Sequence, residues 1–310
     1  MEKAENNLDF TVIVPVYNSE KTLEELYQRI QNTFSKLNRT FEIIFVEDCG
    51  VDKSWEVLCR IKSKNPNSVT IIKLARNFGQ HNAILCGIRY SRGKYVITID
   101  DDLQIPPEEI EKLINEYEKS KSELVYGIYK NRKQKFYRNI GSLLIQLIFK
   151  WLFKNKSEIT SFRLIEYELA SKLSNHKQSF VFLDGLLHWY TKYISYVPVN
   201  HLERKYGKSG YNLKKLIKLG SNLIFNFSTI PLRTMIFLGF IFSIITFILG
   251  VIFIIRKIIF DVPIGFTSII VSIFFVGSVI LMVIGVVGEY ISRIFALQND
   301  KPQFSIKEIK

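Results

Sequence analysis

The chain has 310 residues and a formal net charge of +13. Residues 1–110 carry 14 Lys and Arg against 16 Asp and Glu, whereas residues 111–310 carry 28 against 13, so the basic half is expected to face an anionic partner, either nucleic acid or membrane phosphate. The three Cys residues are an odd number without metal-ligand spacing, which argues against a disulfide framework and favours a reducing compartment.

The chain opens with MEKAENNLDF, which has no apolar run, so we expect no cleaved signal peptide. Apolar runs then alternate with helical patterns. Strands that are apolar almost throughout, with helices between them, are typical of a parallel sheet covered on both faces. The sequence therefore predicts an α/β domain over about residues 1–210. The expected strands are 10–16, 41–47, 69–75, 94–100 and 123–129, and the expected helices are 20–37, 53–64, 80–91 and one opening at Pro107.

Polar clusters follow four of these strands, with the sequences PVYNSE, VEDCGVDKS, ARNFGQH and DDDLQ. Each cluster alone is compatible with a solvated turn or a helix cap. Because ligands bind at the carboxyl ends of the strands in such sheets, four clusters on one edge indicate a binding site.

Three adjacent carboxylates, Asp100, Asp101 and Asp102, end the fourth strand. In extended backbone Asp100 and Asp102 share one face and Asp101 points the other way. Mg²⁺ binds one or two carboxylates together with substrate phosphates, and Mn²⁺ suits the same oxygen ligands. We expect a divalent cation here. The alternative, acids preceding a helix, accounts for one aspartate only, because the effect of the helix dipole fades within the first turn.

The basic half begins with an apolar segment, KFYRNIGSLLIQLIFKWLF, in which Arg138, Ser142, Gln146 and Lys150 recur every four residues. Such a polar stripe predicts a helix at the lipid interface over about residues 136–153, with a buried core helix as the alternative. A second amphipathic segment, 211–232, carries lysines on one face and suits an anionic leaflet.

Two long apolar segments follow, at 234–255 and about 264–288. A bilayer core requires about 20 apolar residues in a helix, so residues 233–289 are predicted to form a transmembrane hairpin rather than a buried core hairpin. The positive-inside rule places the large N-terminal domain, the 290–310 tail and both termini in the cytoplasm. The basic residues that flank the hairpin are Lys214, Lys215, Lys218, Arg233, Arg293, Lys301, Lys307 and Lys310.

Seven motifs follow one another along the chain: VIVPVYNSEKTL, VEDCGVDKSWEVL, RNFGQHNAILCGI, GKYVITIDDDLQIPPEEI, SFRLIEYEL, HLERKYGKSGYNLKKL and NFSTIPLR. This ordered set resembles glycosyltransferase family 2, in particular its polyprenyl-phosphate branch, which includes dolichol-phosphate mannose synthases and bacterial undecaprenyl-phosphate sugar transferases of the 4-deoxy-4-formamidoarabinose and O-antigen glucosyl types. The resemblance covers nearly the whole chain and implies the GT-A fold. Three positions depart from the family pattern: Ser19 replaces a common Glu, Glu47 an Asp, and Asp101 a common Ala.

The resemblance also implies roles for individual residues. Asp100, Asp102 and Gln104 would hold Mg²⁺ or Mn²⁺. The catalytic residues would be Asp100, Asp102, Arg138 and Arg204. The nucleotide sugar would contact Pro15, Tyr17, Glu20, Asp48, Arg76, Asp100 and Asp102. The acceptor phosphate would lie near Arg138 and Ser142, and Arg163 matches a family position that is either structural or in contact with this phosphate. Arg204 and Lys208 are added from the residues themselves, because glycines beside cations in RKYGKSGY suit a loop that closes on phosphates, with a plain basic surface loop as the alternative.

From these features we expect a metal-dependent, inverting glycosyltransferase of the inner membrane. It would transfer a sugar from a nucleotide diphosphate, with UDP favoured over GDP, to undecaprenyl phosphate for modification of the cell envelope. Relatives suggest a homotetramer. The alternatives are a tethered glycosyltransferase with a glycan or protein acceptor, and a non-catalytic lipid-binding scaffold. A nucleic-acid binder is not expected to place its basic residues before two membrane spans.

Overall fold

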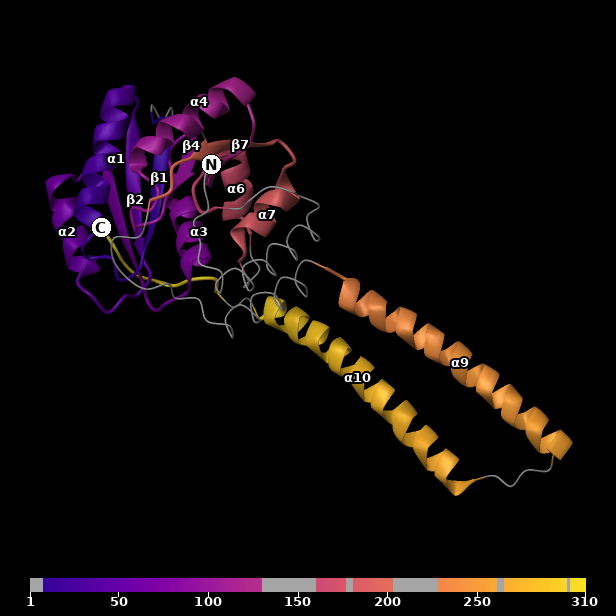
Figure 1. The fold of residues 1–310 in the computed structure, drawn as a ribbon. Coiled ribbons are helices and arrows are strands. Elements are labelled where there is room, and N and C mark those ends of the chain that lie inside the picture. The colour runs from indigo at the N-terminus through magenta and orange to yellow at the C-terminus, as the bar shows by residue number, and fades with distance from the viewer. Residues whose placement is uncertain (1–7, 130–159, 177–180, 203–227, 261–264, 300–301) are drawn as a thin grey trace. The chain divides into compact units, whose positions relative to one another are not determined.

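The computed structural model describes residues 8–129, 160–176, 181–202, 228–260, 265–299 and 302–310 (Figure 1). The predicted interfacial helix at 136–153 and most of the 211–232 segment lie outside these ranges. The chain divides into two units, one of residues Met1–Leu213 with Lys301–Lys310 and the other of residues Lys214–Asp300. Each unit is described by itself.

The first unit is built on an eight-stranded mixed sheet. Strand β1 lies at its centre and pairs in parallel with β2 and β4, and β2 pairs in parallel with β3. The strand order is β7-β5-β6-β4-β1-β2-β3-β8. The bounds are β1 Phe10–Val16, β2 Phe41–Glu47, β3 Val69–Leu74, β4 Tyr95–Thr98, β5 Leu124–Tyr129, β6 Arg163–Glu166, β7 Ile194–Val199 and β8 Ile306–Ile309.

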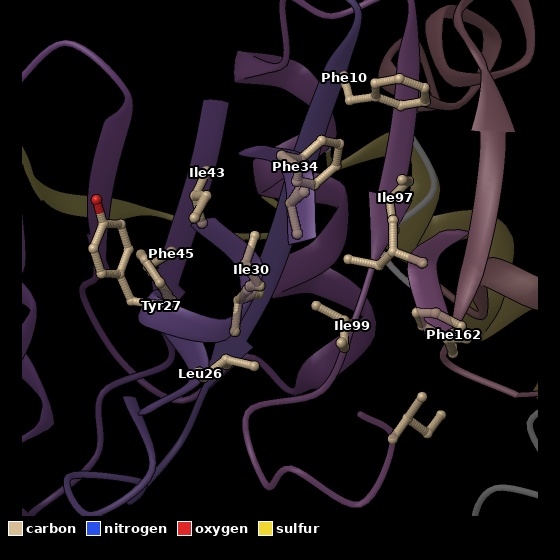
Figure 2. Packing of buried hydrophobic residues seen from close by; sticks show 14 of the residues in the cluster. Phe10, Leu26, Tyr27, Ile30, Phe34, Ile43, Phe45, Ile97, Ile99 and Phe162 are labelled. Carbon is tan, nitrogen blue, oxygen red and sulfur yellow. The ribbon is translucent and has the colours of Figure 1, made fainter. Parts of the chain in front are cut away.

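Helices cover both faces of the sheet (Figure 1), and every residue of β1 is buried. On one face Ile30 and Phe34 of α1 pack into a cluster with Phe10 and Ile43 of the strands (Figure 2). This spacing of four residues places the apolar side chains on one stripe of the helix. The helices are α1 Leu23–Leu37, α2 Ser54–Lys64, α3 Gln80–Tyr90, η1 Pro107–Glu109, α4 Ile110–Ser120, α6 Tyr167–Ser174 and α7 Leu183–Tyr190.

Helix α3 covers the other face, where Ala83 and Cys86 pack with Ile44 and Ile72. Its approach to β1 depends on Gly87, because a Cβ atom at this position would lie 2.5 Å from the Ile13 side chain. The sequence expectation of an α/β domain with a mostly parallel, two-sided sheet is confirmed.

Two strands run antiparallel and were not predicted. Strand β6 pairs with β4 and β5, and β8 pairs with β3, with Ile309 opposite Ile72. Residues 290–310 were expected to form a plain tail, but α10 continues to Gln298 and the last residues complete the edge of the sheet. The side chain of Gln303 is buried beside Arg89, which donates a hydrogen bond to it.

The second unit contains two long helices, α9 Ile230–Phe260 and α10 Phe266–Gln298. They include apolar stretches at Ile230–Ile252 and Phe275–Phe295, and none of the side chains that the structure describes in those stretches is buried. A core hairpin of a soluble domain would bury such side chains, so the exposure disfavours that alternative. By length and composition α9 and α10 are two candidate membrane-spanning helices.

Candidate functional site

Hydrogen bonds connect the loop after β1 to the loop after β2, and in each of them a side chain of one loop accepts from a backbone N–H of the other. The Asn18 Oδ1 atom accepts a hydrogen bond from the Val51 N–H at 2.8 Å. The Glu20 carboxylate accepts one from the Lys53 N–H at 3.0 Å, and the Asp52 carboxylate accepts one from the Glu20 N–H at 3.0 Å. Glu20, predicted to contact the nucleotide sugar, therefore has a structural task in joining these loops.

Tyr17 and Pro15 of the same region differ in accessibility. Tyr17 follows the end of β1 and is 51 % exposed, as a residue that contacts a ligand must be. Pro15 lies inside β1, opposite Val46 of β2, and is buried. The Tyr17 side chain is therefore accessible to a ligand at the edge of the sheet, whereas the buried Pro15 forms part of strand β1.

The loop of three aspartates does not continue the strand. Strand β4 ends at Thr98, and the backbone turns at Asp101 and Asp102. Leu103 then adopts a left-handed conformation with φ of 58°. The prediction that Asp100 and Asp102 share a face by strand alternation is therefore wrong. The turn forms because the Asp102 carboxylate accepts a hydrogen bond from the Gln104 N–H at 3.1 Å, as Asp does in turns.

Asp101 connects this turn to the loop after β1. Its Oδ2 atom accepts hydrogen bonds from the Tyr17 N–H at 2.9 Å and from the Ser19 hydroxyl at 2.5 Å. The Thr22 hydroxyl donates to the Asp101 carbonyl at 2.6 Å. Burial raises the pKa of Asp101 to about 7, with the charge of neighbouring Asp100 acting in the same direction and the two hydrogen bonds opposing it. These three hydrogen bonds show that Asp101 connects the turn after β4 to the loop after β1.

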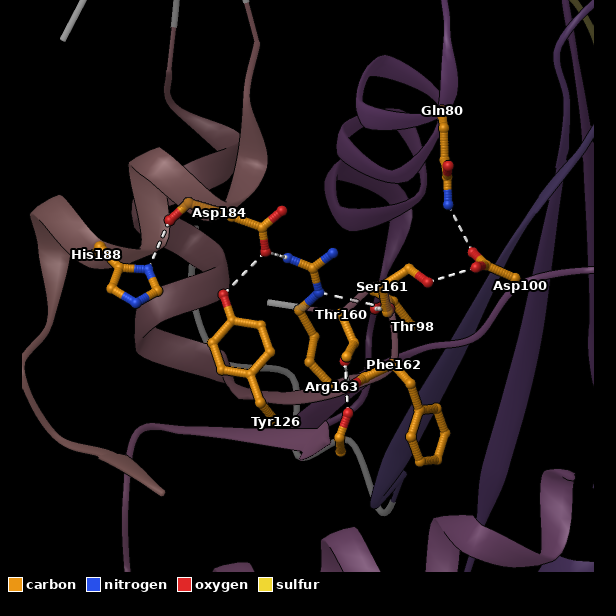
Figure 3. Close-up of polar contacts among 11 residues, drawn as sticks. Gln80, Thr98, Asp100, Tyr126, Thr160, Ser161, Phe162, Arg163, Asp184 and His188 are labelled. Carbon is orange, nitrogen blue, oxygen red and sulfur yellow. Dashed lines mark hydrogen bonds and ion pairs between the residues drawn. The ribbon is translucent and has the colours of Figure 1, made fainter. Parts of the chain in front are cut away.

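Asp100 is held by two neutral donors from different elements (Figure 3). The Gln80 side chain, at the start of α3, donates to Oδ1 at 2.6 Å. The Ser161 hydroxyl donates to Oδ2. Neither Gln80 nor Ser161 was among the predicted site residues. Together they fix the orientation of the carboxylate at the carboxyl edge of the sheet.

The side-chain oxygen atoms in this loop are of the type that a divalent cation binds. Asp100, Asp102 and Gln104 offer hard oxygen atoms, and a carboxylate oxygen that accepts one hydrogen bond retains a second lone pair. Among the described residues, no group of three or more His, Cys, Asp and Glu side chains could hold a metal ion. Mg²⁺ requires only one or two carboxylates when phosphates and water complete its octahedron, so two carboxylates suffice.

Asp48 is 4 % exposed, and both of its oxygens are engaged by the loop after β3. They accept hydrogen bonds from the Phe78 N–H at 2.7 Å and the Gly79 N–H at 2.8 Å. Burial raises the pKa of Asp48 to about 6, although these two hydrogen bonds lower it. Gly79 has φ of 89°, a conformation that glycine adopts without strain. Asp48 thus shapes the loop that carries the exposed Arg76, whose guanidinium stacks on Phe78 at 4.7 Å.

Arg163 is buried, with 1 % of its surface exposed, and forms an ion pair with Asp184 of α7. The Tyr126 hydroxyl also donates to Asp184, at 3.0 Å, and the Arg163 guanidinium lies over the Tyr126 ring at 5.5 Å (Figure 3). Burial raises the pKa of Tyr126 well above its ordinary value. These contacts favour a supporting role for Arg163 over the predicted contact with an acceptor phosphate.

The remaining predicted acceptor residues, Arg138, Ser142, Arg204 and Lys208, lie outside the described residues. Asp184 was missed, although a single acid within the apolar run VFLDGLL is a sequence signal for a buried pair. Gln80 belongs to the predicted ARNFGQH cluster but was not singled out. Ser161 opens the SFRLIEYEL motif but was not singled out, since its contact with Asp100 depends on the pairing of β6 with β4.

The family model for Glycosyl transferase family 2 matches residues 11–173. The chain is 31% identical to the Bacillus subtilis (strain 168) glycosyltransferase YkcC over 306 residues, which covers 97% of this chain and 94% of that protein. It is also 31% identical over 308 residues to the undecaprenyl-phosphate 4-deoxy-4-formamido-L-arabinose transferase of Proteus mirabilis (strain HI4320), covering 96% of this chain and 93% of the relative.

Among solved structures, the chain is similar to mannosyl-3-phosphoglycerate synthase from Rubrobacter xylanophilus, with a TM-score of 0.50 and 13% sequence identity. The match covers 71% of this chain and 72% of that one. At this identity the likeness concerns the fold alone, and it agrees with the mixed sheet and its flanking helices.

Proposed function

The chain belongs to glycosyltransferase family 2 and has a GT-A-like fold, and from this premise we propose that it transfers a sugar from a nucleotide diphosphate to undecaprenyl phosphate or another polyprenyl phosphate. One observation carries the choice of acceptor. The similarity to a transferase named for undecaprenyl phosphate extends over 96% of the chain and so includes both candidate membrane helices.

The donor is proposed to bind at the carboxyl ends of β1 to β4. Tyr17 and Arg76 are exposed there and would contact the nucleotide, while Pro15, Glu20 and Asp48 would shape the neighbouring strand and loops. Asp100, Asp102 and Gln104 would hold Mg²⁺ or Mn²⁺ at the diphosphate. A bound cation would offset the negative charge that develops on the leaving diphosphate.

The acceptor phosphate is proposed to meet Arg138, Ser142, Arg204 and Lys208 of the basic half. A phosphate monoester has a second pKa of about 6, so its oxygen is already nucleophilic at neutral pH and requires no strong general base. The reaction instead requires cations, because two anionic groups must approach each other. A single in-line displacement would form the bond from the phosphate oxygen to the anomeric carbon, break the bond to the diphosphate and invert the anomeric centre.

The enzyme is proposed to reside in the inner membrane with the hairpin of α9 and α10 inserted and the catalytic unit in the cytoplasm. The chain enters the hairpin from the catalytic unit and returns to it as β8, which requires both ends of the hairpin to face the same compartment. The basic residues near those ends favour the cytoplasmic side. A homotetramer, as the family resemblance implies, is part of this proposal.

The test uses purified full-length protein in nanodiscs with undecaprenyl phosphate, Mn²⁺ and a panel of UDP- and GDP-sugars. The expected product is a sugar linked to the lipid phosphate. Formation of free sugar or of a glycan on protein, without the lipid product, would overturn the proposal and favour a tethered glycosyltransferase with another acceptor. Lipid binding without any metal-dependent nucleotide binding would instead indicate a scaffold.

A further inference from the structure

Helix α7 places an acid in the interior of the catalytic unit. Asp184 lies in the first turn of the helix, is 4 % exposed and is ion-paired with Arg163 of β6. Removing two charges from water is costly, and replacing a buried ion pair with apolar side chains of similar volume is often neutral or stabilising. Stability alone therefore gives a weak reason for this pair.

The pair is connected to the proposed donor site through β6. Arg163 lies opposite Thr98 of β4 in the antiparallel register. The Arg163 Nε atom lies 3.5 Å from the Ser161 carbonyl, which also accepts a hydrogen bond from the Thr98 hydroxyl. The Ser161 hydroxyl in turn donates to Asp100. Figure 3 shows these groups in sequence, from Asp184 to Asp100.

We propose that the Arg163–Asp184 ion pair is a positioning device for Asp100, acting through Ser161. This inference rests on the proposed function. The ion pair holds the guanidinium against the Ser161 carbonyl, and the fixed backbone directs the Ser161 hydroxyl at the Asp100 carboxylate. The carboxylate is thereby kept in the orientation that receives a cation bound to the donor diphosphate. Neither Arg163 nor Asp184 touches the substrate in this role.

The chemistry of arginine suits this task. A guanidinium is planar, carries five N–H donors and stays charged, so it can bind a carboxylate and a backbone carbonyl in one fixed geometry. A second contact fixes the acid, because the Tyr126 hydroxyl donates to the same Asp184 oxygen that Arg163 contacts. The His188 Nδ1 atom lies 2.8 Å from the backbone carbonyl of Asp184, a contact within α7 one turn along the helix.

The first variant, Ser161→Ala, removes only the last link and leaves the ion pair in place. Binding of UDP and of GDP is titrated calorimetrically to full-length protein in nanodiscs, with and without Mn²⁺. Whichever nucleotide wild type binds, we expect its Mn²⁺-dependent affinity to fall about tenfold in this variant, because that is the contribution of one hydrogen bond to a charged group. The melting temperature should not change. The matched control is Ser174→Ala. The Ser174 hydroxyl donates to the Ser171 carbonyl within α6, away from Asp100, so this variant should bind the nucleotide with the affinity of wild type.

The second variant, Arg163→Met with Asp184→Leu, replaces the ion pair by apolar side chains. We expect the melting temperature to stay the same or rise, while the Mn²⁺-dependent affinity falls as in Ser161→Ala. Adding Ser161→Ala to this variant should cause little further loss, since linked residues are not additive. Wild-type affinity in the double variant would overturn the inference by showing that the pair is structural only.

If the double variant fails to fold, Ser161→Ala decides alone, and wild-type affinity there would overturn the inference. Failure of the proposed function gives a different result. A wild-type protein that binds neither UDP nor GDP with Mn²⁺ would overturn the proposed function and this inference together. Normal binding by wild type and by every variant would remove this inference and leave the proposed function in place.

Discussion

The Ser19 hydroxyl donates a hydrogen bond to Asp101 across 2.5 Å, although the two residues lie 82 positions apart in the chain. Asp101 also accepts from the Tyr17 N–H. The middle aspartate therefore joins the loop after β1 to the loop after β4. Both loops belong to the proposed donor site, so this contact sets their separation.

Replacing Asp101 with Ala should raise the KM for the donor about tenfold, because the Tyr17 N–H and the Ser19 hydroxyl lose their shared acceptor and such a hydrogen bond contributes about 1.5 kcal/mol. The KM for the lipid acceptor should not change. Steady-state kinetics with each substrate varied in turn check this. Asp9→Ala, which also removes a carboxylate that accepts from a hydroxyl but lies before β1, is the control. An unchanged donor KM in Asp101→Ala would show that the loops hold their places without it.

Asp102→Asn should lower kcat at least about a hundredfold, the scale of losing one electrostatic contact in a transition state. The fold should survive, because Asn can still accept the hydrogen bond from the Gln104 N–H. Circular dichroism and kcat with saturating Mn²⁺ measure the two effects. Near-normal turnover would contradict the metal assignment.

Arg138→Ala should weaken use of the lipid acceptor more than nucleotide binding, because Arg138 is assigned to the acceptor phosphate. The KM for undecaprenyl phosphate and the Kd for the nucleotide should be measured on the same preparation. Arg39→Ala, which removes an exposed arginine paired with Glu118, controls for the loss of one positive charge. Equal losses in both constants would remove the assigned role of Arg138.

Asp48 should make stability depend on pH below neutrality. Its pKa is raised from 3.8 to about 6 by burial, so the native state binds a proton more tightly than the unfolded chain does. The stabilising contribution of the protonated group is complete below pH 4 and is lost as pH rises through 6. The melting temperature of wild type minus that of Asp48→Asn should therefore rise as pH falls from 7 to 5. A difference that is independent of pH would show that Asp48 titrates normally.

The repeating pattern of apolar strands and helices could be predicted from sequence because each element carries its own signal. The bounds of β1 and β2 agree with the prediction residue for residue. Strand β4 ended earlier than expected, since side-chain hydrogen bonds from Thr22 and to Asp102 stabilise a turn that apolar periodicity does not encode. The antiparallel strands β6 and β8 are short, and their partners lie far away in the chain.

The same distinction holds for the site. Polar loops at the sheet edge were predicted, because strand ends of a parallel sheet converge whatever the details of packing. The hydrogen-bond partners of individual side chains were not predicted. Gln80 and Ser161 meet at Asp100 only after α3 and β6 have packed on the sheet, and Asp184 reaches Arg163 only after α7 has done so. Such contacts are products of tertiary structure.

The pairing of β8 with β3 orders the assembly of the protein during synthesis. Strand β3 is complete at Leu74, but its neighbour begins at Ile306, after both long helices have been translated. Until then the edge of β3 has no β8 to pair with, and unpaired edges invite association with other chains. The pairing of β3 with β8 can therefore form only after both long helices have been translated, and this side of β3 lacks that partner strand while the hairpin is being synthesised.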